Sequence, residues 1–270
     1  MKPTVLTISA LVFLLLLSAF AHGHGAHDEF VAECLEELRE NPADQAVRYK
    51  LAVAYVQHGD GELALIELSQ LEGAAIDTSL TRAQALILCG RHEDARKLLD
   101  SVLEKSPENS QALLERARAF SLLKNPGMSL MDYRAAMNLT PSPNPEFCLE
   151  MAEMLIVHSQ PAEALTVIQK GLSARGEVPM LLLRAMEMEI AAANYDAALS
   201  HLAVLEKQAP RPEAWMARRA ELLAQAGRAE ASRASWASLK QRIAALPNLQ
   251  RGTPELLSLS AKADAGLASH

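Results

Sequence analysis

Apolar and small side chains recur along this chain with the spacing of paired helices. In the clearest segment, residues 179–212, they fall at the i, i+3 and i+4 intervals that place side chains on one face of a helix. The same order of positions returns in segments that begin near residues 45, 76, 110, 145, 179 and 213. A period of about 34 residues, with two amphipathic helices in each repeat, is typical of helical repeat arrays. The pattern therefore predicts an all-α fold of about six helix pairs.

The predicted array covers residues 45–246. Its repeats are predicted at 45–78, 76–109, 110–143, 145–178, 179–212 and 213–246. Asn125-Pro126-Gly127 makes a turn between two helices. Because a helix pair cannot bury its apolar face alone, neighbouring pairs must share a core. We therefore expect one elongated domain.

Two flanking segments are predicted to cap this array. Residues 29–42 form an amphipathic helix with its apolar side chains on one side. At the other end Thr253 and Pro254 are a strong helix start, with threonine as N-cap and proline in the first turn. We expect the helix over residues 253–268 to direct its leucines onto the last repeat.

The first residues are typical of a secretory signal peptide. An apolar run over residues 5–17 follows Lys2, and the small residues of a cleavage site end at Ala21. The run is shorter than the roughly 20 residues that cross a bilayer as a helix. We predict that residues 1–21 are removed and that the mature protein is periplasmic or secreted. An uncleaved membrane anchor is the alternative.

A histidine-rich leader over residues 22–28 follows the predicted cleavage site. The new amino group, two backbone nitrogens and the side chain of His24 would supply the square-planar nitrogen set that suits Cu(II) or Ni(II). His22 and His27 could add further donors. The alternative is a flexible, glycine-spaced leader that binds nothing, since short histidine-rich tracts are only a compositional hint.

Charge and motifs narrow the function further. The chain has a net charge of −7 at pH 7, so nothing in its electrostatics favours binding to nucleic acid or to anionic lipid. The sequence lacks the motifs of zinc proteases, serine hydrolases and nucleotide-binding proteins. We therefore expect no enzymatic activity, no membrane insertion after signal cleavage, and no cofactor other than the metal considered above.

The three cysteines, Cys34, Cys89 and Cys148, form an odd set in a chain that is predicted to be exported. We interpret them as small apolar packing residues. A disulfide is the alternative, and it would need Cα atoms closer than about 7 Å.

Residues 45–246 resemble the tetratricopeptide repeat family. Segments such as Gly90-Arg91-His92-Glu93-Asp94-Ala95 and Asn194-Tyr195-Asp196-Ala197-Ala198 are similar to the turn that opens the second helix of its repeats. The resemblance implies a right-handed superhelical solenoid whose first helices line a concave groove. It also implies a scaffold or adaptor that binds another protein or a peptide segment.

In that family the fifth and ninth positions of each repeat face the groove. The resemblance therefore predicts a partner-binding site at Tyr49, Leu80, Gln84, Leu114, Arg118, Leu149, Glu153, Leu183 and Glu187. We expect the partner to bind by apolar side chains and to place basic groups near Glu153 and Glu187. Alternatively, Leu114 and Leu149 pack against neighbouring first helices, and Arg184 with Glu187 is a surface ion pair.

Glu189 breaks the apolar pattern at the eleventh position of the fifth repeat. Because an unpaired buried charge is costly, we expect a small register shift that turns Ile190 inward in its place. A buried functional carboxylate is the alternative.

Three functions follow from these patterns. The leading hypothesis is an exported scaffold that holds another envelope or secreted protein. The competing hypothesis is a metal-handling envelope protein whose leader captures copper or nickel. A hydrolase is the third, and the sequence offers no catalytic constellation for it.

Overall fold

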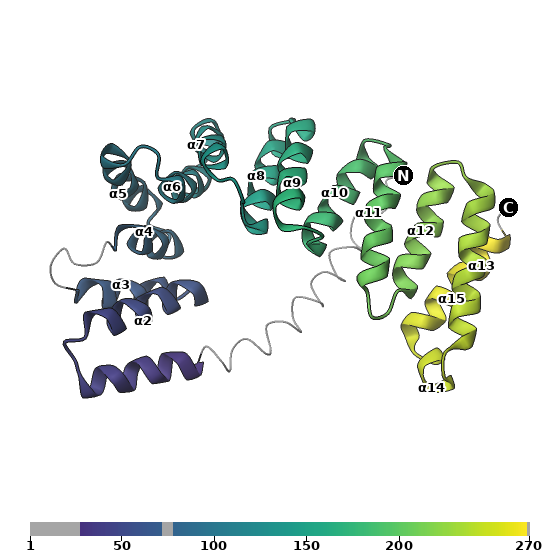
Figure 1. The fold of residues 1–270 in the computed structure, drawn as a ribbon, viewed down its shortest axis with the longest axis horizontal. Helices are drawn as coiled ribbons and strands as arrows, with labels where there is room; N and C mark the ends of the chain where they lie inside the picture. The colour runs from purple at the N-terminus through teal and green to yellow at the C-terminus, as the bar shows by residue number, and fades with distance from the viewer. Residues whose placement is uncertain (1–27, 72–77, 269–270) are drawn as a thin grey trace. The chain divides into compact units, whose positions relative to one another are not determined.

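The computed structural model describes residues 28–71 and 78–268, and all regular structure in these ranges is helical (Figure 1). In chain order the helices are an N-terminal helix over residues 28–40, α2 (Gln45–His58), α3 (Gly61–Ser69), α4 (Ser79–Leu88), α5 (His92–Lys105), α6 (Ser110–Leu122), α7 (Pro126–Leu139), α8 (Pro145–Val157), α9 (Pro161–Arg175), α10 (Pro179–Ala191), α11 (Tyr195–Gln208), α12 (Glu213–Gln225), α13 (Ala229–Ala245), α14 (Asn248–Arg251) and α15 (Pro254–Ala268). Within the described ranges, the predicted all-α class, the six helix pairs and both flanking helices are confirmed.

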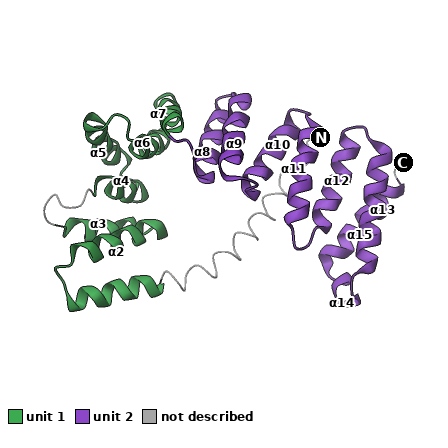
Figure 2. Cartoon of the chain, viewed as in Figure 1, with its two compact units in different colours: residues 1–139 green, residues 140–270 purple. Residues whose placement is uncertain are grey.

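The chain divides into two compact units, unit 1 over residues 1–139 and unit 2 over residues 140–270 (Figure 2). Each contains three helix pairs in its described part. The signal peptide predicted at residues 1–21 lies outside the described residues, and so do His22, His24 and His27. The superhelical path of the whole array stays a prediction.

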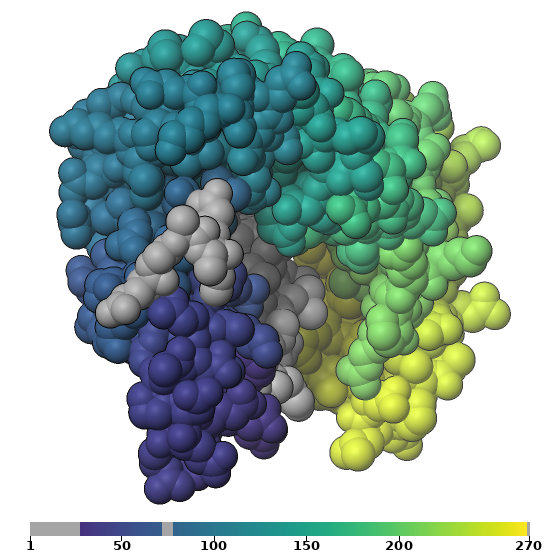
Figure 3. Space-filling view, turned by 60° about the vertical axis from the view of Figure 1, so that its left-hand side comes forward, coloured from purple at the N-terminus to yellow at the C-terminus, as the bar shows by residue number. Residues whose placement is uncertain are grey.

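Unit 1 is a stack of two helical layers. Each helix from α2 to α7 contacts the next one along the chain, and the first helices of the pairs also contact each other, α2 with α4 and α4 with α6. We call these three helices the first-helix layer of unit 1. The N-terminal helix packs on α2 through Cys34 and Leu38, which meet Val47 and Leu51. In the space-filling view of Figure 3 the N-terminal helix and α2 form the purple surface of unit 1.

Unit 2 repeats the arrangement. Helix α10 contacts both helices of the preceding pair, α8 and α9, and α15 contacts α12 and α13 in the same way. Helix α15 therefore takes the place that the first helix of a further pair would occupy. Its Gly266 lies so close to α13 that a Cβ atom there would be 2.3 Å from Nε1 of Trp236. This close packing explains how the predicted C-terminal cap covers the last pair.

Each helix pair turns at an equivalent place. The fifteenth position of every predicted repeat has a φ between 56° and 89°, and these residues are Gly59, Gly90, Lys124, Ser159, Ala193 and Gly227. A left-handed residue just after a helix satisfies its last carbonyl groups. Glycine adopts this conformation without steric cost, whereas Lys124, Ser159 and Ala193 adopt it under strain.

The two helices of each pair meet at a small side chain. The twentieth position of each repeat is fully buried and holds Ala64, Ala95, Ser129, Ala164, Ala198 or Ser232. Where serine replaces alanine, its hydroxyl donates to the first helix: Ser129 to the carbonyl oxygen of Ala117, and Ser232 to that of Ala220, each at 2.8 Å. The serines therefore keep the close approach and leave no unpaired hydroxyl inside.

The expected register shift at Glu189 is wrong. Glu189 is buried, and Ile190 is half-buried at the edge of the same core, so the helix keeps its pattern. The contacts of α10 with both neighbouring helices hold it in register more strongly than one polar side chain disfavours it.

Candidate functional site

Polar side chains connect the first helices of unit 1. The hydroxyl of Tyr49 on α2 lies 3.0 Å from the hydroxyl of Thr81 on α4. One helix further, the Nε2 atom of Gln84 on α4 donates to the Oε1 atom of Glu115 on α6 at 2.7 Å. Thr81 and Glu115 both occupy the sixth position of their repeats, and each contact joins two successive first helices, so the two contacts help to fix the register of the first-helix layer.

Glu115 is a buried carboxylate, with about 1% of the residue exposed. Its Oε1 atom also accepts from Gln111 at 3.2 Å and from the guanidinium of Arg118 at 2.9 Å. A buried charge with several hydrogen-bond donors is stable, and it in turn orients those donors. The carboxylate therefore holds Gln84 and Arg118, two predicted site residues, in fixed positions on the first-helix layer.

Exposed leucines lie one helical turn beyond these polar residues. Leu88 follows Gln84 by four residues and Leu122 follows Arg118 by four, so each pair shares one helix face. Leu88 is 46% exposed and Leu122 45% exposed, whereas Leu114 is only 5% exposed. Leu114 thus packs inside the layer, as in the alternative interpretation, and its small exposed area limits direct contact with a partner.

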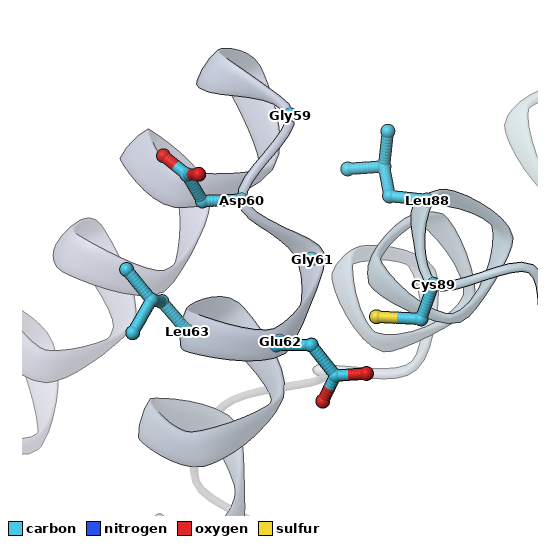
Figure 4. Close-up of a pocket in the computed structure, with 7 residues that line it drawn as sticks. All are labelled: Gly59, Asp60, Gly61, Glu62, Leu63, Leu88 and Cys89. Carbon is cyan, nitrogen blue, oxygen red and sulfur yellow. The ribbon is translucent and has the colours of Figure 1, made fainter.

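A cavity of about 220 Å³ adjoins this row of leucines (Figure 4). It is lined by Gly59, Asp60, Gly61, Glu62, Leu63, Leu88 and Cys89. Gly61 allows the wall to form, because a Cβ atom there would lie 2.7 Å from the backbone oxygen of Ala85. Burial and a hydrogen bond with Glu62 raise the pKa of Cys89, so its thiol stays protonated at neutral pH. The wall of the cavity combines the apolar side chains of Leu63 and Leu88 with the carboxylates of Asp60 and Glu62.

In unit 2 the predicted site residues surround an ion-paired arginine. Arg184 on α10 contacts Glu153 on α8 at 2.6 Å and Glu187 on its own helix at 3.0 Å. Leu149 and Leu183 are half-buried beside them. The carboxylates that were expected to meet basic groups of a partner already share one internal cation.

The structure brings the predicted residues together in two groups. In unit 1, Tyr49, Leu80, Gln84, Leu114 and Arg118 lie on the first-helix layer, and in unit 2, Leu149, Glu153, Leu183 and Glu187 lie on α8 and α10.

Sequence reasoning missed the thirteenth position of the repeats, which is Leu88, Leu122 and Val157 in three successive ones. An apolar residue recurring four positions after the ninth was the signal that could have identified it.

Metal and thiol chemistry find little support in the described residues. These ranges contain no group of three or more histidine, cysteine or acidic side chains that could hold a metal ion. His22, His24 and His27 lie outside them, so the metal site at the leader stays a prediction. All three cysteines are free, and burial raises the pKa of Cys148 to about 11.

Among the described helices, none is both long and apolar enough to span a bilayer.

Comparison with protein families agrees with this architecture. A tetratricopeptide repeat model matches residues 76–119, which is the second repeat and the start of the third. A search of curated proteins finds no match. The match supports a tetratricopeptide repeat in this part of the chain.

Three solved structures illustrate the fold. PilF of Pseudomonas aeruginosa is 15% identical, with a TM-score of 0.54 over 81% of this chain and 97% of its own. A chain of the Naa15/Naa10 assembly bound to HypK-THB is 15% identical, with a TM-score of 0.53 over 83% of this chain and 34% of its own. YrrB, a TPR protein with an unusual peptide-binding site, is 15% identical, with a TM-score of 0.50 over 61% of this chain and 84% of its own. At such identities the likeness establishes the fold alone.

Proposed function

We propose that this protein is an exported scaffold that binds a peptide or protein segment of another envelope or secreted protein on its first helices. Tetratricopeptide repeat proteins generally mediate protein–protein interactions, and their fold is typically a non-catalytic scaffold. The proposed export rests on the signal-like sequence of residues 1–21.

The observation that carries the proposal is the row of exposed leucines in unit 1. Leu88 and Leu122 are nearly half exposed, although other apolar side chains of the same helices are buried in the core. A face of a folded protein that exposes several large apolar side chains can mark an interaction site. Here it adjoins both a cavity and two polar side chains that Glu115 holds in place.

This arrangement suits an extended or helical segment. An apolar side chain of the partner would enter the cavity beside Leu63 and Leu88, and a second would contact Leu122. The side-chain carbonyl of Gln84 could accept a backbone N–H of the partner, since its amide nitrogen donates to Glu115. Binding would thus combine apolar contact with a hydrogen bond from a side chain that is already ordered.

The test replaces both leucines by glutamate. Leu88→Glu with Leu122→Glu should abolish capture of the partner from an envelope extract, measured by affinity capture with mass spectrometry. These positions suit the test better than Leu114, where a charge would be buried and would unfold the layer.

The matched control is Leu249→Glu, which changes an equally apolar but fully solvated residue on α14. Circular dichroism should show the same helicity in all three proteins. Capture of the same partner by wild type and by the double variant would place the site elsewhere.

A second proposal concerns the leader, where His24 would be the third residue of the mature chain. The mature protein would then bind Cu(II) or Ni(II) through its amino terminus, as a metal-handling envelope protein. A Cu(II) titration should show a site that is lost when residues 22–24 are deleted. Equal Cu(II) binding by the full mature protein and by the deletion variant would contradict this proposal.

A further inference from the structure

Unit 2 also leaves apolar side chains without cover on its first helices. Val157 on α8 is 76% exposed, and Met180 on α10 is 41% exposed. Val157 follows Glu153 by four residues, and Met180 precedes Glu187 by seven, so each apolar residue shares a helix face with a carboxylate. The half-buried Leu149 and Leu183 complete the surface between them. We call these six residues the α8–α10 face.

The charges on this face do not balance. Arg184 serves both Glu153 and Glu187, one cation for two carboxylates. The side chain of Glu153 is 57% exposed and that of Glu187 32%, whereas that of Arg184 is only 22% exposed. Solvent and any partner therefore meet carboxylate oxygens before they meet the guanidinium.

The carboxylates on two other first helices are paired differently. On the neighbouring helix α12, Glu221 has two cations near it, Arg218 at 3.5 Å and Lys262 of α15 at 3.3 Å. In unit 1 the equivalent layer contains a carboxylate that is buried, Glu115, and it is held by Arg118. Among these first helices, accessible carboxylates beside exposed apolar side chains thus distinguish the α8–α10 face. At the unit 1 cavity the exposed Asp60 and Glu62 also lie near Leu88, but they belong to the turn before α3 and to α3 itself.

We infer that the α8–α10 face binds a partner segment that carries lysine or arginine next to apolar side chains, such as a basic amphipathic helix. This inference rests on the proposed function and adds the chemistry of the segment that unit 2 accepts. The apolar side chains of the segment would cover Val157 and Met180. Its cation would approach Glu153 and supply the charge that Arg184 alone does not balance.

The direct test uses synthetic peptides, so it does not depend on finding the natural partner. One peptide of leucine and lysine forms an amphipathic helix; a second has glutamate in place of lysine; a third has serine in place of leucine. Fluorescence anisotropy should show binding of the leucine–lysine peptide, with affinity that falls as salt is added. The leucine–glutamate and serine–lysine peptides should bind at least about tenfold more weakly.

Protein variants locate the site. Glu153→Lys should weaken binding of the leucine–lysine peptide by about tenfold, and Val157→Ser should weaken it without changing its salt dependence. Glu104→Lys is the matched control, because it makes the same charge change at an exposed position of α5 in unit 1. It should leave the affinity within about twofold of wild type, since a distant exposed charge is screened.

The inference fails if Glu104→Lys and Glu153→Lys weaken binding equally, because the attraction would then come from net charge. It also fails if wild type binds the leucine–glutamate peptide as well as the leucine–lysine peptide. Neither result affects the capture experiment with the Leu88 and Leu122 variants, which tests the proposed function separately in unit 1.

Discussion

At the residue scale, the ordered surface of unit 1 depends on one buried carboxylate. Glu115 accepts hydrogen bonds through a single oxygen from Gln84, Gln111 and Arg118. Two of these donors come from its own helix and one from α4. The carboxylate therefore links the stability of the layer to the geometry of the proposed binding surface.

Replacing Glu115 by alanine should lower the free energy of unfolding by about 1–3 kcal/mol, because the shared acceptor of three donors is lost. Urea unfolding followed by circular dichroism measures this change. Gln111→Ala is the control, since it removes only the longest of the three bonds and its side chain is exposed. Equal stability of Glu115→Ala and wild type would show that the buried network does not stabilise the layer.

The buried thiol of Cys148 should be unreactive in the folded protein. Burial raises its pKa to about 11, and a Cβ atom at Gly171 would lie 2.8 Å from its Sγ atom, so there is neither thiolate nor space at pH 8. Alkylation followed by mass spectrometry should modify the half-buried Cys89 first. The rate at Cys148 should rise as the pH approaches 11. Rapid modification of Cys148 at pH 8 would contradict its burial.

The exposure of individual side chains was the feature that the sequence predicted least well. Position in the repeat predicted that Leu114 and Arg118 lie on the first helices, because helical periodicity determines which face a side chain takes. It left open whether Leu114 is covered, and it did not predict that Leu88 and Leu122 are exposed. That difference depends on how α4 packs against α6, which the local sequence pattern does not determine.

At the element scale, the repeated unit is a pair of helices with a common turn and a common crossing point. The turn needs a left-handed residue, and the crossing needs a small one. Both requirements restrict the residue types at fixed positions of the repeat. The helix pairs could therefore be predicted from the spacing of residues alone. The turn is also where three repeats lack glycine and carry strain.

Ala193→Gly should therefore raise the free energy of unfolding by about 0.5–1 kcal/mol. Relief of the left-handed strain at a φ of 56° outweighs the greater freedom of glycine in the unfolded chain. Ala192→Gly is the matched control: its φ is −85°, so glycine relieves nothing there and should lower stability. Chemical denaturation of both variants checks the prediction, and destabilisation by Ala193→Gly would contradict the strain.

At the scale of the whole molecule, six helix pairs in the described residues belong to two compact units with different surfaces. Unit 1 presents exposed leucines beside a cavity, and unit 2 presents apolar side chains beside accessible carboxylates. The sequence predicted one array, because the repeat period continues through residues 139 and 140. That prediction of one array stays a prediction, and the two compact units reflect long-range contacts that periodicity does not encode.

The acidic surface of unit 2 was partly predictable from the sequence. Glutamates at the ninth position of the later repeats suggested an acidic surface, and Arg184 at the sixth position suggested an ion pair. That one arginine serves two carboxylates on different helices became visible only when α8 and α10 were placed side by side.

Site-specific photo-crosslinking in intact cells can show directly whether a partner binds on the first helices. A photoreactive amino acid would replace Leu88 or Leu122, and in a separate protein Leu249 as the control. We predict that positions 88 and 122 crosslink to the same segment of one partner protein, identified by mass spectrometry, and that position 249 does not. Crosslinks from position 249 alone, or none from positions 88 and 122, would contradict the account.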